Sequence, residues 1–314
     1  KQQLRGSPRA VDYLKRRGLT GEIAARFGLG YAPDRWDPLK GAFADYEQPE
    51  LVTAGLVVHK ADEDKRYDRF RDRIMFPIRN ARGDVIGFGG RIIDAGEPKY
   101  LNSPETPVFQ KGSELYGLFE ARQAIRERGY VLVVEGYMDV IALAEAGFAG
   151  AVAPLGTALT EDHVQVLKNF TRHIVLAYDA DNAGQTAAEK WYTWEQRFEI
   201  DVRVAALPEG GDPADLFKAD PGALERAVEG ARSFMQFKLD RVLGAADLGS
   251  PEGRARAAQA SVRVLREHTN ELVREGYIQQ VAGLTGFDHA WFKRVGRLEF
   301  DEHDNVIIVP DKTE

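Results

Sequence analysis

The chain has 314 residues, 44% of them hydrophobic, which is enough to bury large cores in two or three domains. It contains no cysteine, so disulfides and Cys-ligated zinc are excluded within these residues, and no apolar run is long enough to cross a bilayer or resembles a signal peptide. The net charge of −7 argues against a uniformly basic nucleic-acid binder.

The first 64 residues are predicted to be helical at first and irregular later. Apolar residues recur at helical spacing over residues 10–17 and 22–27. Gly18 and Gly28 follow these two segments, in the position where glycine commonly ends a helix.

The next segment changes character and favours strands and loops. Two short apolar runs at residues 74–78 and 85–88 flank the sequence NARGD at residues 80–84, and this order is typical of a β-hairpin. Gly89 and Gly90 then begin a stretch rich in glycine and proline, for which we expect loops.

Residues 118–229 alternate between short, continuous apolar runs and segments with helical periodicity. Such runs are typical of strands buried on both faces, so we expect consecutive βαβ units and an α/β fold with a mainly parallel sheet flanked by helices. Ligands of open α/β sheets bind at the carboxyl ends of the strands. The predicted strands are residues 131–134, 151–154, 174–178 and 202–207, and the predicted helices are residues 118–128, 138–146, 160–170 and 184–197.

The chain from about residue 230 is predicted to be helical as far as residue 298, with one β-like run at residues 306–309 before a polar tail. Packing of these helices on the α/β core is the default, and contact with a partner is the alternative. We therefore expect three parts, an N-terminal basic α+β subdomain (1–117), an α/β subdomain (118–229) and a C-terminal helical subdomain (230–314).

Charge is unevenly distributed over these parts. Residues 65–111 contain ten Lys/Arg and six Asp/Glu, whereas residues 1–64 contain ten of each sign and the remainder is strongly acidic. A basic segment beside an acidic one is typical of a protein that holds a polyanion between cationic side chains and metal ions. Chance variation of charge along the chain explains the basic excess equally well, so this pattern alone does not establish that the protein binds a polyanion.

Acidic residues stand at the ends of the predicted strands. Glu135 follows the first strand, and Asp139 lies four residues on, in the predicted first turn of the next helix. Asp179 and Asp181 are two residues apart, so in an extended segment both side chains point to the same side and can share one ion. A lone Asp-x-Asp is most often an acidic turn or a helix cap, and the combination at successive strand ends is the stronger signal.

The sequence DPAD at residues 212–215 adds two acids after the last predicted strand. Carboxylates gathered at one sheet edge repel one another unless cations lie among them, so we expect divalent metal ions there. Two such ions about 3.5–4 Å apart suit phosphoryl or nucleotidyl transfer. We expect two or more Mg²⁺ or Mn²⁺ ions, no organic cofactor and no zinc, and the candidate metal ligands are Glu135, Asp179, Asp181, Asp212 and Asp215.

The basic segment supplies candidate contacts to nucleotides and template. Arg69, Arg71 and Arg73 alternate, and on a strand they would share one face and make a cationic stripe. A solvated edge strand protected by charge is the alternative. Further side chains that could hold a triphosphate, or in the case of the tyrosine stack on a base or pack in the core, are Arg91, Lys99, Tyr100, Asn102 and Lys111.

Several motifs together resemble those of the bacterial DnaG-type primase family. VVEGYMD at residues 133–139 and YDADNAG at residues 178–184 resemble the Toprim motif, which primases share with topoisomerases and certain nucleases. Further motifs in the flanking sequence resemble those of primases in particular, and not those of the other Toprim proteins. These motifs are FGLGYAP (27–33), RFRDRIMFPI (69–78), GFGGR (87–91), PKYLNSPET (98–106) and LGT (155–157). The resemblance runs from about Val11 to Leu216 and is loose beyond residue 230.

The resemblance implies a Toprim-type sheet and the RNA polymerase core of a primase, which makes short RNA primers on single-stranded DNA from NTPs during replication. It implies that the basic segment binds nucleotide and template near the metals, and that the acidic catalytic site consists of Glu135, Asp139, Asp179, Asp181 and Asp212. The family usually has an aspartate where this chain has Ala214. Either Asp215 substitutes for it, or that ligand is lost.

The resemblance also implies where the protein acts and with what. We expect a cytoplasmic protein at the bacterial nucleoid and replication fork, with template, NTPs and RNA primer as partners and no membrane. A whole primase of this family carries an N-terminal zinc-binding domain and a C-terminal domain that contacts the replicative helicase. We expect both to be absent here, because there is no cysteine and the chain begins with Lys1 inside the polymerase core.

Two other classes of function stay open at this point. A topoisomerase needs a tyrosine nucleophile in a separate DNA-gate domain, of which the chain gives no sign, and an ATPase-coupled nuclease would carry a G-x-x-x-x-G-K-[ST] motif, which does not occur. The third class is a non-catalytic nucleic-acid-binding module, against which the full set of acids argues. A template-directed incorporation assay separates the three.

Overall fold

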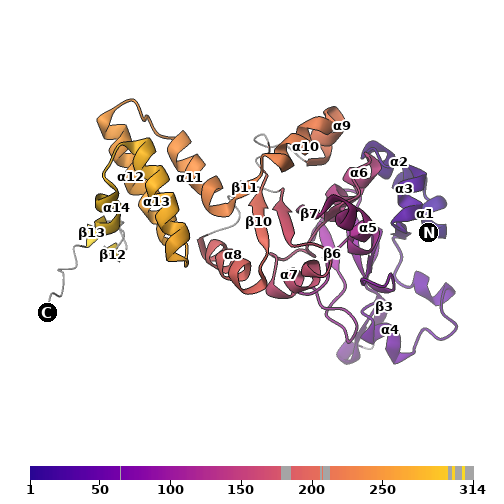
Figure 1. Cartoon of the computed structure of the whole chain (residues 1–314). Coiled ribbons are helices and arrows are strands. Elements are labelled where there is room, and N and C mark those ends of the chain that lie inside the picture. The colour runs from indigo at the N-terminus through magenta and orange to yellow at the C-terminus, as the bar shows by residue number, and fades with distance from the viewer. Residues whose placement is uncertain are drawn as a thin grey trace. The chain divides into compact units, whose positions relative to one another are not determined.

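The chain folds into two units (Figure 1). The first comprises Lys1–Tyr178 and Leu207–Glu229, and the second comprises Asp179–Ala206 and Gly230–Glu314. The computed structural model describes residues 1–63, 65–177, 185–205, 207, 213–295, 299–300 and 306–307. None of the helices in these ranges has the length and apolarity of a membrane span. The division into three parts at residues 117 and 229 stays a prediction.

Helices α2 and α3 begin at hydroxyl caps and end before glycines. Ser7 and Thr20 each accept a hydrogen bond from the backbone N–H three residues further on, which satisfies one of the free donors of the helix start. Gly18 and Gly28 follow in the left-handed conformation, with φ of 75° and 72°, so both predicted helices are confirmed. The helices of this part are α1 (Gln2–Arg5), α2 (Pro8–Arg16), α3 (Gly21–Arg26) and α4 (Pro49–Thr53), with 3-10 turns at Pro38–Gly41 and Ala61–Glu63.

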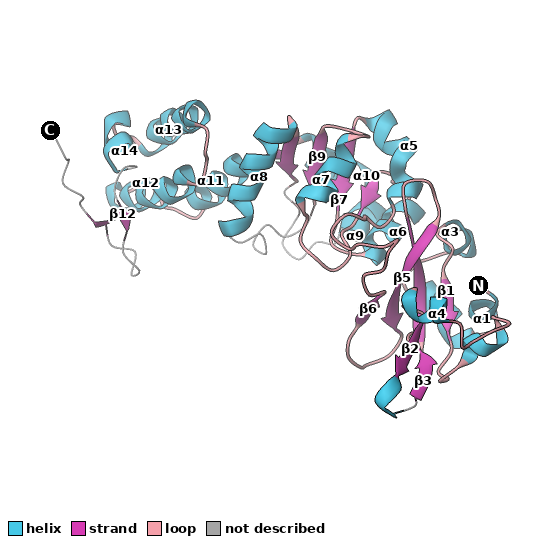
Figure 2. Ribbon diagram, turned by 90° about the horizontal axis from the view of Figure 1, so that it is seen from below, coloured by secondary structure: helices cyan, strands magenta, loops and turns pink. Residues whose placement is uncertain are grey.

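An antiparallel sheet with the strand order β1-β4-β5-β6 organises the N-terminal part of the first unit, and Figure 2 shows its strands with α1 beside β1. Strands β4 and β5 form the predicted hairpin, because Asn80 Oδ1 accepts the backbone N–H groups of residues 82–84 in the turn. The strands are β1 (Gly30–Ala32), β2 (Val57–Lys60), β3 (Lys65–Asp68), β4 (Arg73–Arg79), β5 (Val85–Ile92) and β6 (Tyr100–Asn102), with β2 and β3 in a separate hairpin.

Gly89 and Gly90 lie inside strand β5 and not in a loop, so that prediction was wrong. A Cβ at Gly89 would stand 2.6 Å from Cε2 of Tyr137, and a Cβ at Gly90 would stand 2.9 Å from Cδ1 of Phe70. Glycine at these positions therefore allows close packing on both faces of the strand and makes no turn. The short strand β6, which pairs with β5, also lies in the stretch that was predicted to be loop.

The parallel sheet of the first unit has the order β8-β7-β9, with β7 in the centre. Leu132 of β7 lies opposite Ala151 of β8 and Val175 of β9, and all residues of the run 131–134 are fully buried. This confirms the predicted parallel strands flanked by helices. The elements are α5 (Leu118–Arg128), β7 (Tyr130–Val133), α6 (Tyr137–Glu145), β8 (Ala151–Val152), α7 (Glu161–Lys168), β9 (His173–Leu176), α9 (Pro213–Ala219) and α10 (Pro221–Glu229).

The second unit is mainly helical, as predicted for the chain beyond residue 230. Ser250 caps α12 and Asn270 caps α13, and α13 ends at Gly286 with φ of 74°. Strand β10 pairs with β11 in antiparallel orientation. The elements are α8 (Gln185–Phe198), β10 (Asp201–Val204), β11 (Arg232–Ser233), α11 (Phe234–Gly244), α12 (Pro251–Arg266), α13 (Glu271–Thr285), α14 (His289–Val295), β12 (Glu299–Phe300) and β13 (Val306–Ile307).

Candidate functional site

Glu135 lies at the carboxyl end of β7, where the buried strand meets solvent. Val134 before it is fully buried, whereas the Glu135 side chain is exposed. Gly136 then adopts an extended conformation and α6 begins at Tyr137, so the chain turns from strand to helix within two residues. The sequence therefore places an exposed carboxylate at the edge of the sheet where α/β folds bind ligands.

Asp139 belongs to the first turn of α6, as predicted. Its Oδ2 accepts a hydrogen bond of 3.0 Å from the backbone N–H of Gly136, and the side chain is half-buried. A carboxylate at this position satisfies a free donor and interacts favourably with the positive end of the helix dipole. Asp139 thus holds the strand-to-helix turn next to Glu135, and its catalytic role stays a prediction.

The remaining predicted acids are placed unequally. Asp179, Asp181 and Asp212 lie outside the described residues. Asp215 is exposed in the first turn of α9, whereas the side chain of Ala214 is buried. Within the part of the chain that the structure describes, no three His, Asp or Glu side chains form a group that could hold a metal ion. Among the predicted acids in the described ranges, Glu135 and Asp215 are exposed carboxylates, and carboxylate oxygens are donors of the kind that hard cations such as Mg²⁺ and Mn²⁺ prefer.

Tyr137 connects the acidic turn to the antiparallel sheet. Its ring centroid lies 4.7 Å from that of Tyr116, 5.5 Å from that of Phe76 and 5.9 Å from that of Tyr100. Its hydroxyl donates a 2.6 Å hydrogen bond to Oδ1 of Asn102. Burial raises the pKa of Tyr137. Sequence reasoning missed this residue, although its place between Glu135 and Asp139 in the motif was a signal.

Asn102 on strand β6 joins two loops at the carboxyl edge of the parallel sheet. Its Oδ1 receives the Tyr137 hydroxyl, and its Nδ2 donates to the backbone carbonyl of Leu155 at 2.9 Å. Leu155 lies in the loop that follows β8, and Tyr137 is the first residue of α6, the helix that follows β7. The predicted nucleotide-binding or template-binding role of Asn102 is untested, and its amide already makes two protein contacts.

Arg91, Tyr100 and Lys99 lie beside this connection. The Arg91 guanidinium is 5.5 Å from the Tyr100 ring centroid and 5.1 Å from that of Tyr13, and its side chain is buried. Burial raises the pKa of Tyr100, and the neighbouring Arg91 partly offsets this rise. Lys99 is exposed. A cationic and aromatic surface therefore borders the Glu135 turn.

Arg69, Arg71 and Arg73 do not share a strand, so the predicted stripe is wrong. Only Arg73 belongs to β4, and residues 69–72 form a turn between β3 and β4. Asp72 has φ of 49°, and its carboxylate accepts hydrogen bonds of 2.7 Å from both Arg9 and Tyr31. The Arg9 contact holds the pKa of Asp72 below its usual range. This left-handed turn breaks the alternation of side chains.

The three arginines therefore have different surroundings. Arg73 is buried and donates to the backbone carbonyls of Gly90 at 3.2 Å, Pro98 at 3.0 Å and Lys99 at 3.5 Å, so it holds the loop between β5 and β6. Its burial lowers the pKa of its guanidinium. Arg69 is half-buried and reaches the carbonyl of Asn102 at 3.5 Å.

Arg71 lies against aromatic rings at the surface. Its guanidinium is 4.5 Å from the ring centroid of Trp36 and 5.0 Å from that of Tyr67, and it donates to the carbonyl of Asp68. Trp36 is 65% exposed. Its neighbours Arg35 and Asp37 line a cavity of about 1020 Å³ whose walls also include apolar side chains and further cations.

Lys111 is half-buried, and its backbone is fixed on both sides. Its N–H donates to Glu105 Oε1 at 3.1 Å, and its carbonyl lies 2.9 Å from Nε2 of His163. His163 is fully buried, and its Nδ1 accepts from the N–H of Thr160, so Nε2 carries the proton and donates to the Lys111 carbonyl. Burial lowers the pKa of His163, which acts as a neutral structural link.

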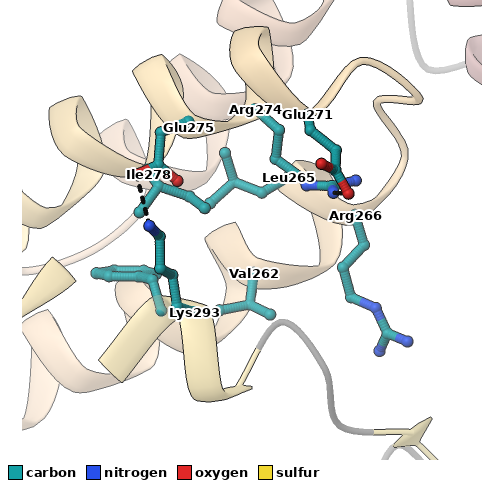
Figure 3. Close-up of a pocket in the computed structure, with 9 residues that line it drawn as sticks. Val262, Leu265, Arg266, Glu271, Arg274, Glu275, Ile278 and Lys293 are labelled. Atoms are coloured by element: carbon teal, nitrogen blue, oxygen red, sulfur yellow. Dashed lines mark ion pairs between the residues drawn. The ribbon is translucent and has the colours of Figure 1, made fainter. Parts of the chain in front are cut away.

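A smaller hollow of about 390 Å³ lies in the second unit among α12, α13 and α14 (Figure 3). Val262, Leu265 and Ile278 contribute apolar surface to it. Charged side chains surround this surface, and Lys293 forms an ion pair of 2.9 Å with Glu275. At the start of α13, Leu272 is 84% exposed and its neighbour Val273 is 40% exposed.

Three family models match successive parts of the chain. Residues 1–122 match the DNA primase catalytic core, N-terminal domain, and residues 129–206 match the Toprim domain. Residues 235–290 match the DnaB-helicase binding domain of primase. The last match overturns the expectation that no helicase-contacting domain is present in these residues. Sequence reasoning missed it because amphipathic helices alone do not distinguish a partner surface from a packing surface.

Individual relatives agree with these matches. A DNA primase of Pseudomonas aeruginosa is 45% identical over 301 residues, which are 91% of this chain and 45% of that protein, so the chain spans about half the length of the curated relatives it matches. The crystal structure of a DNA primase domain from Pseudomonas aeruginosa matches with a TM-score of 0.76 and 43% identity, covering 94% of this chain and 95% of that one. A structure of the DnaG primase catalytic domain bound to ssDNA matches with a TM-score of 0.72 and 40% identity, covering 93% and 94%.

Proposed function

The chain belongs to the DNA primase family, and on that premise we propose that it is an RNA polymerase core that makes short RNA primers on single-stranded DNA at the replication fork. The observation that supports this most is the exposed Glu135 carboxylate at the end of β7, two residues before Tyr137, whose ring packs on Tyr100 of β6 beside Arg91 of β5. An acid that meets cations at a sheet edge suits nucleotidyl transfer, which handles phosphates and divalent metal together.

The side chains have separate parts in the proposed reaction. Glu135 would hold divalent ions together with Asp179, Asp181 and Asp212, or accept the proton of the primer 3′-hydroxyl. Lys99, which is exposed, would hold the triphosphate and neutralise negative charge on the leaving pyrophosphate, and Arg91, buried beside Tyr100, would add positive charge to that side of the site. When bound there, Mg²⁺ or Mn²⁺ would supply Lewis-acid chemistry, which favours loss of the 3′-hydroxyl proton and offsets negative charge on the phosphates. The Toprim match supports a metal-dependent core, and the identity and number of the ions are part of the proposal.

The decisive experiment is primer synthesis on single-stranded DNA with labelled NTPs, with and without Mg²⁺ or Mn²⁺. A polymerase core yields labelled oligoribonucleotides only when template and metal are both present. Loss of the template would indicate a nuclease, and retention of the template without incorporation would indicate a binding module. Either of these two results contradicts the proposed function.

Arg71 is the arginine of the β3–β4 turn best placed to meet template DNA. Its guanidinium backs an exposed tryptophan, and an aromatic surface of this kind can stack on a base while the cation meets a phosphate. We expect Arg71→Ala to weaken single-stranded DNA binding and to reduce the slope of log affinity against log salt by about 0.7, the value for one phosphate contact on a single strand. Fluorescence anisotropy at several salt concentrations measures both. An unchanged slope would remove Arg71 from the template path.

We propose further that helices α11 to α13 contact the replicative helicase. The match of residues 235–290 supports this, and the exposed Leu272 directly follows Glu271, which lines the hollow of Figure 3. Leu272→Asp should weaken binding of a DnaB-type helicase roughly tenfold, about 1.4 kcal/mol, because a charge replaces an apolar contact. The helix should persist, since an acidic residue is favourable in the first turn.

A matched control for the helicase measurement is Val108→Asp. Val108 is 66% exposed, but it lies in the first unit, outside the matched segment. Surface plasmon resonance of helicase over both immobilised variants gives the comparison. Equal affinity of the two variants, or retained affinity of Leu272→Asp, would contradict this helicase contact and leave primer synthesis untouched.

A further inference from the structure

The hydroxyl of Tyr137 lies where the acidic turn meets strand β6. Only Gly136 separates Tyr137 from Glu135 in the chain, so any shift of the tyrosine moves the backbone that carries the Glu135 carboxylate. The hydroxyl makes its 2.6 Å hydrogen bond to Asn102, which lies two residues after Tyr100 on the strand beside Arg91. One hydrogen bond therefore joins the acidic and the cationic sides of the candidate site.

The direction of this hydrogen bond follows from the partners of Asn102. A backbone carbonyl can only accept, so the group 2.9 Å from the Leu155 carbonyl must be the amide NH₂ of Asn102. The amide oxygen then faces Tyr137, and the tyrosine hydroxyl must donate.

The ring of Tyr137 has little room to move. Phe76 is stacked at 5.5 Å with an interplanar angle of 30°, and Tyr116 lies at 4.7 Å. On a third side the backbone of Gly89 approaches so closely that a Cβ there would stand 2.6 Å from the ring. The hydroxyl is thus held at one point, and that point is fixed relative to the strand that carries Asn102.

We propose that Tyr137 is a positioning residue, whose hydrogen bond to Asn102 sets the place of the Glu135 carboxylate relative to the nucleotide-binding side of the site. The inference rests on the proposed function, since it assigns Glu135 to the metal ions. It gives the amide of Asn102 a role in joining the loops after β7 and β8, distinct from the substrate contact that its sequence position predicts.

Tyr137→Phe tests this with a matched control. The substitution removes the hydroxyl and keeps the packed ring, and it leaves Asn102 Oδ1 without its donor. Tyr116→Phe removes a hydroxyl from the neighbouring ring, where it is buried and has no hydrogen-bond partner among the described residues. Both changes have the same size in the same aromatic cluster, so a difference between them reports the hydrogen bond.

The readout is direct binding of Mn²⁺, followed by the electron paramagnetic resonance signal of the free ion, in the absence of nucleotide. We expect Tyr137→Phe to raise the Mn²⁺ concentration for half-saturation three- to tenfold, and Tyr116→Phe to change it less than twofold. Primer synthesis against Mn²⁺ concentration should shift in parallel, with a smaller change at saturating metal. Equal Mn²⁺ binding by the two variants, or no change in Tyr137→Phe, would overturn the inference.

A second variant tests whether the packing of the Tyr137 ring matters. Gly89→Ala places a methyl group against Tyr137, so it should displace the ring and weaken Mn²⁺ binding as Tyr137→Phe does. Gly87→Ala is the control on the same strand, because its Cβ would meet Phe109 at 3.2 Å and not Tyr137. If Gly89→Ala folds and binds Mn²⁺ as Gly87→Ala does, the ring does not set the metal site.

These outcomes separate the inference from the proposed function. If the wild-type protein binds Mn²⁺ more tightly than Tyr137→Phe but makes no primers, the positioning role stands and the primase function falls. If the wild-type protein makes primers and Tyr137→Phe matches it in both measurements, the function stands and the positioning role falls.

Discussion

Glu135→Gln should lower the rate of primer synthesis by roughly 10²–10⁴-fold, the range expected when a group that moves a proton in the transition state is removed. The loss has the same physical origin if Glu135 holds a metal ion, because a neutral amide is a much poorer ligand for a hard cation. The fold should be unaffected, since the side chain is exposed and no hydrogen bond or ion pair joins it to another residue in the described ranges. Initial rates with saturating NTPs and metal provide the measurement.

The control for Glu135→Gln is Glu225→Gln. Glu225 is also exposed, and it lies on helix α10 of the same unit, outside the two acidic motifs at residues 133–139 and 178–184. Its rate should stay within twofold of the wild-type rate, and both variants should keep the wild-type unfolding temperature. Primer synthesis by Glu135→Gln at the level of Glu225→Gln would contradict the role of Glu135.

Arg73→Met should destabilise the first unit by about 2–4 kcal/mol, because three backbone carbonyls would lose a buried charged donor at once. Methionine keeps the length of the side chain, so lost packing contributes little. For a unit of this size the midpoint of thermal unfolding should fall by roughly 5–10 °C. Differential scanning calorimetry measures the change.

Arg82→Met provides the comparison for Arg73→Met. Arg82 lies in the turn of the same hairpin, but its side chain is 88% exposed and its nearest carboxylate oxygen is 3.9 Å away. Its unfolding midpoint should match that of the wild type within about 1 °C, as expected for an exposed surface position. If Arg73→Met also keeps the wild-type midpoint and loses DNA affinity instead, Arg73 contacts template and does not hold the β5–β6 loop.

The contrast between Arg71 and Arg73 explains what the sequence could predict and what it could not. Alternation indicates a shared face only while the backbone stays extended. Here the backbone reverses at Asp72, and the groups that stabilise the reversal are Arg9 and Tyr31, which lie 63 and 41 residues away in the chain. A local pattern contains no information about such distant partners.

Patterns that depend on neighbouring residues alone were more reliable. The glycines that follow α2 and α3, the hairpin turn at Asn80, and the buried run before Glu135 all produced the predicted elements. Gly89 shows the limit of such reasoning, because glycine serves a turn and a close contact equally well. The positions of Asp179, Asp181 and Asp212 remain predictions.

The absence of a side chain at Gly89 also has an evolutionary consequence. Any single mutation at this position adds at least a methyl group, which would stand 2.6 Å from the ring of Tyr137. We therefore expect substitutions at Gly89 to be selected against unless a smaller side chain replaces Tyr137 at the same time. The substitutions that are tolerated at residue 89 therefore depend on which side chain is present at residue 137, almost 50 positions further along the chain.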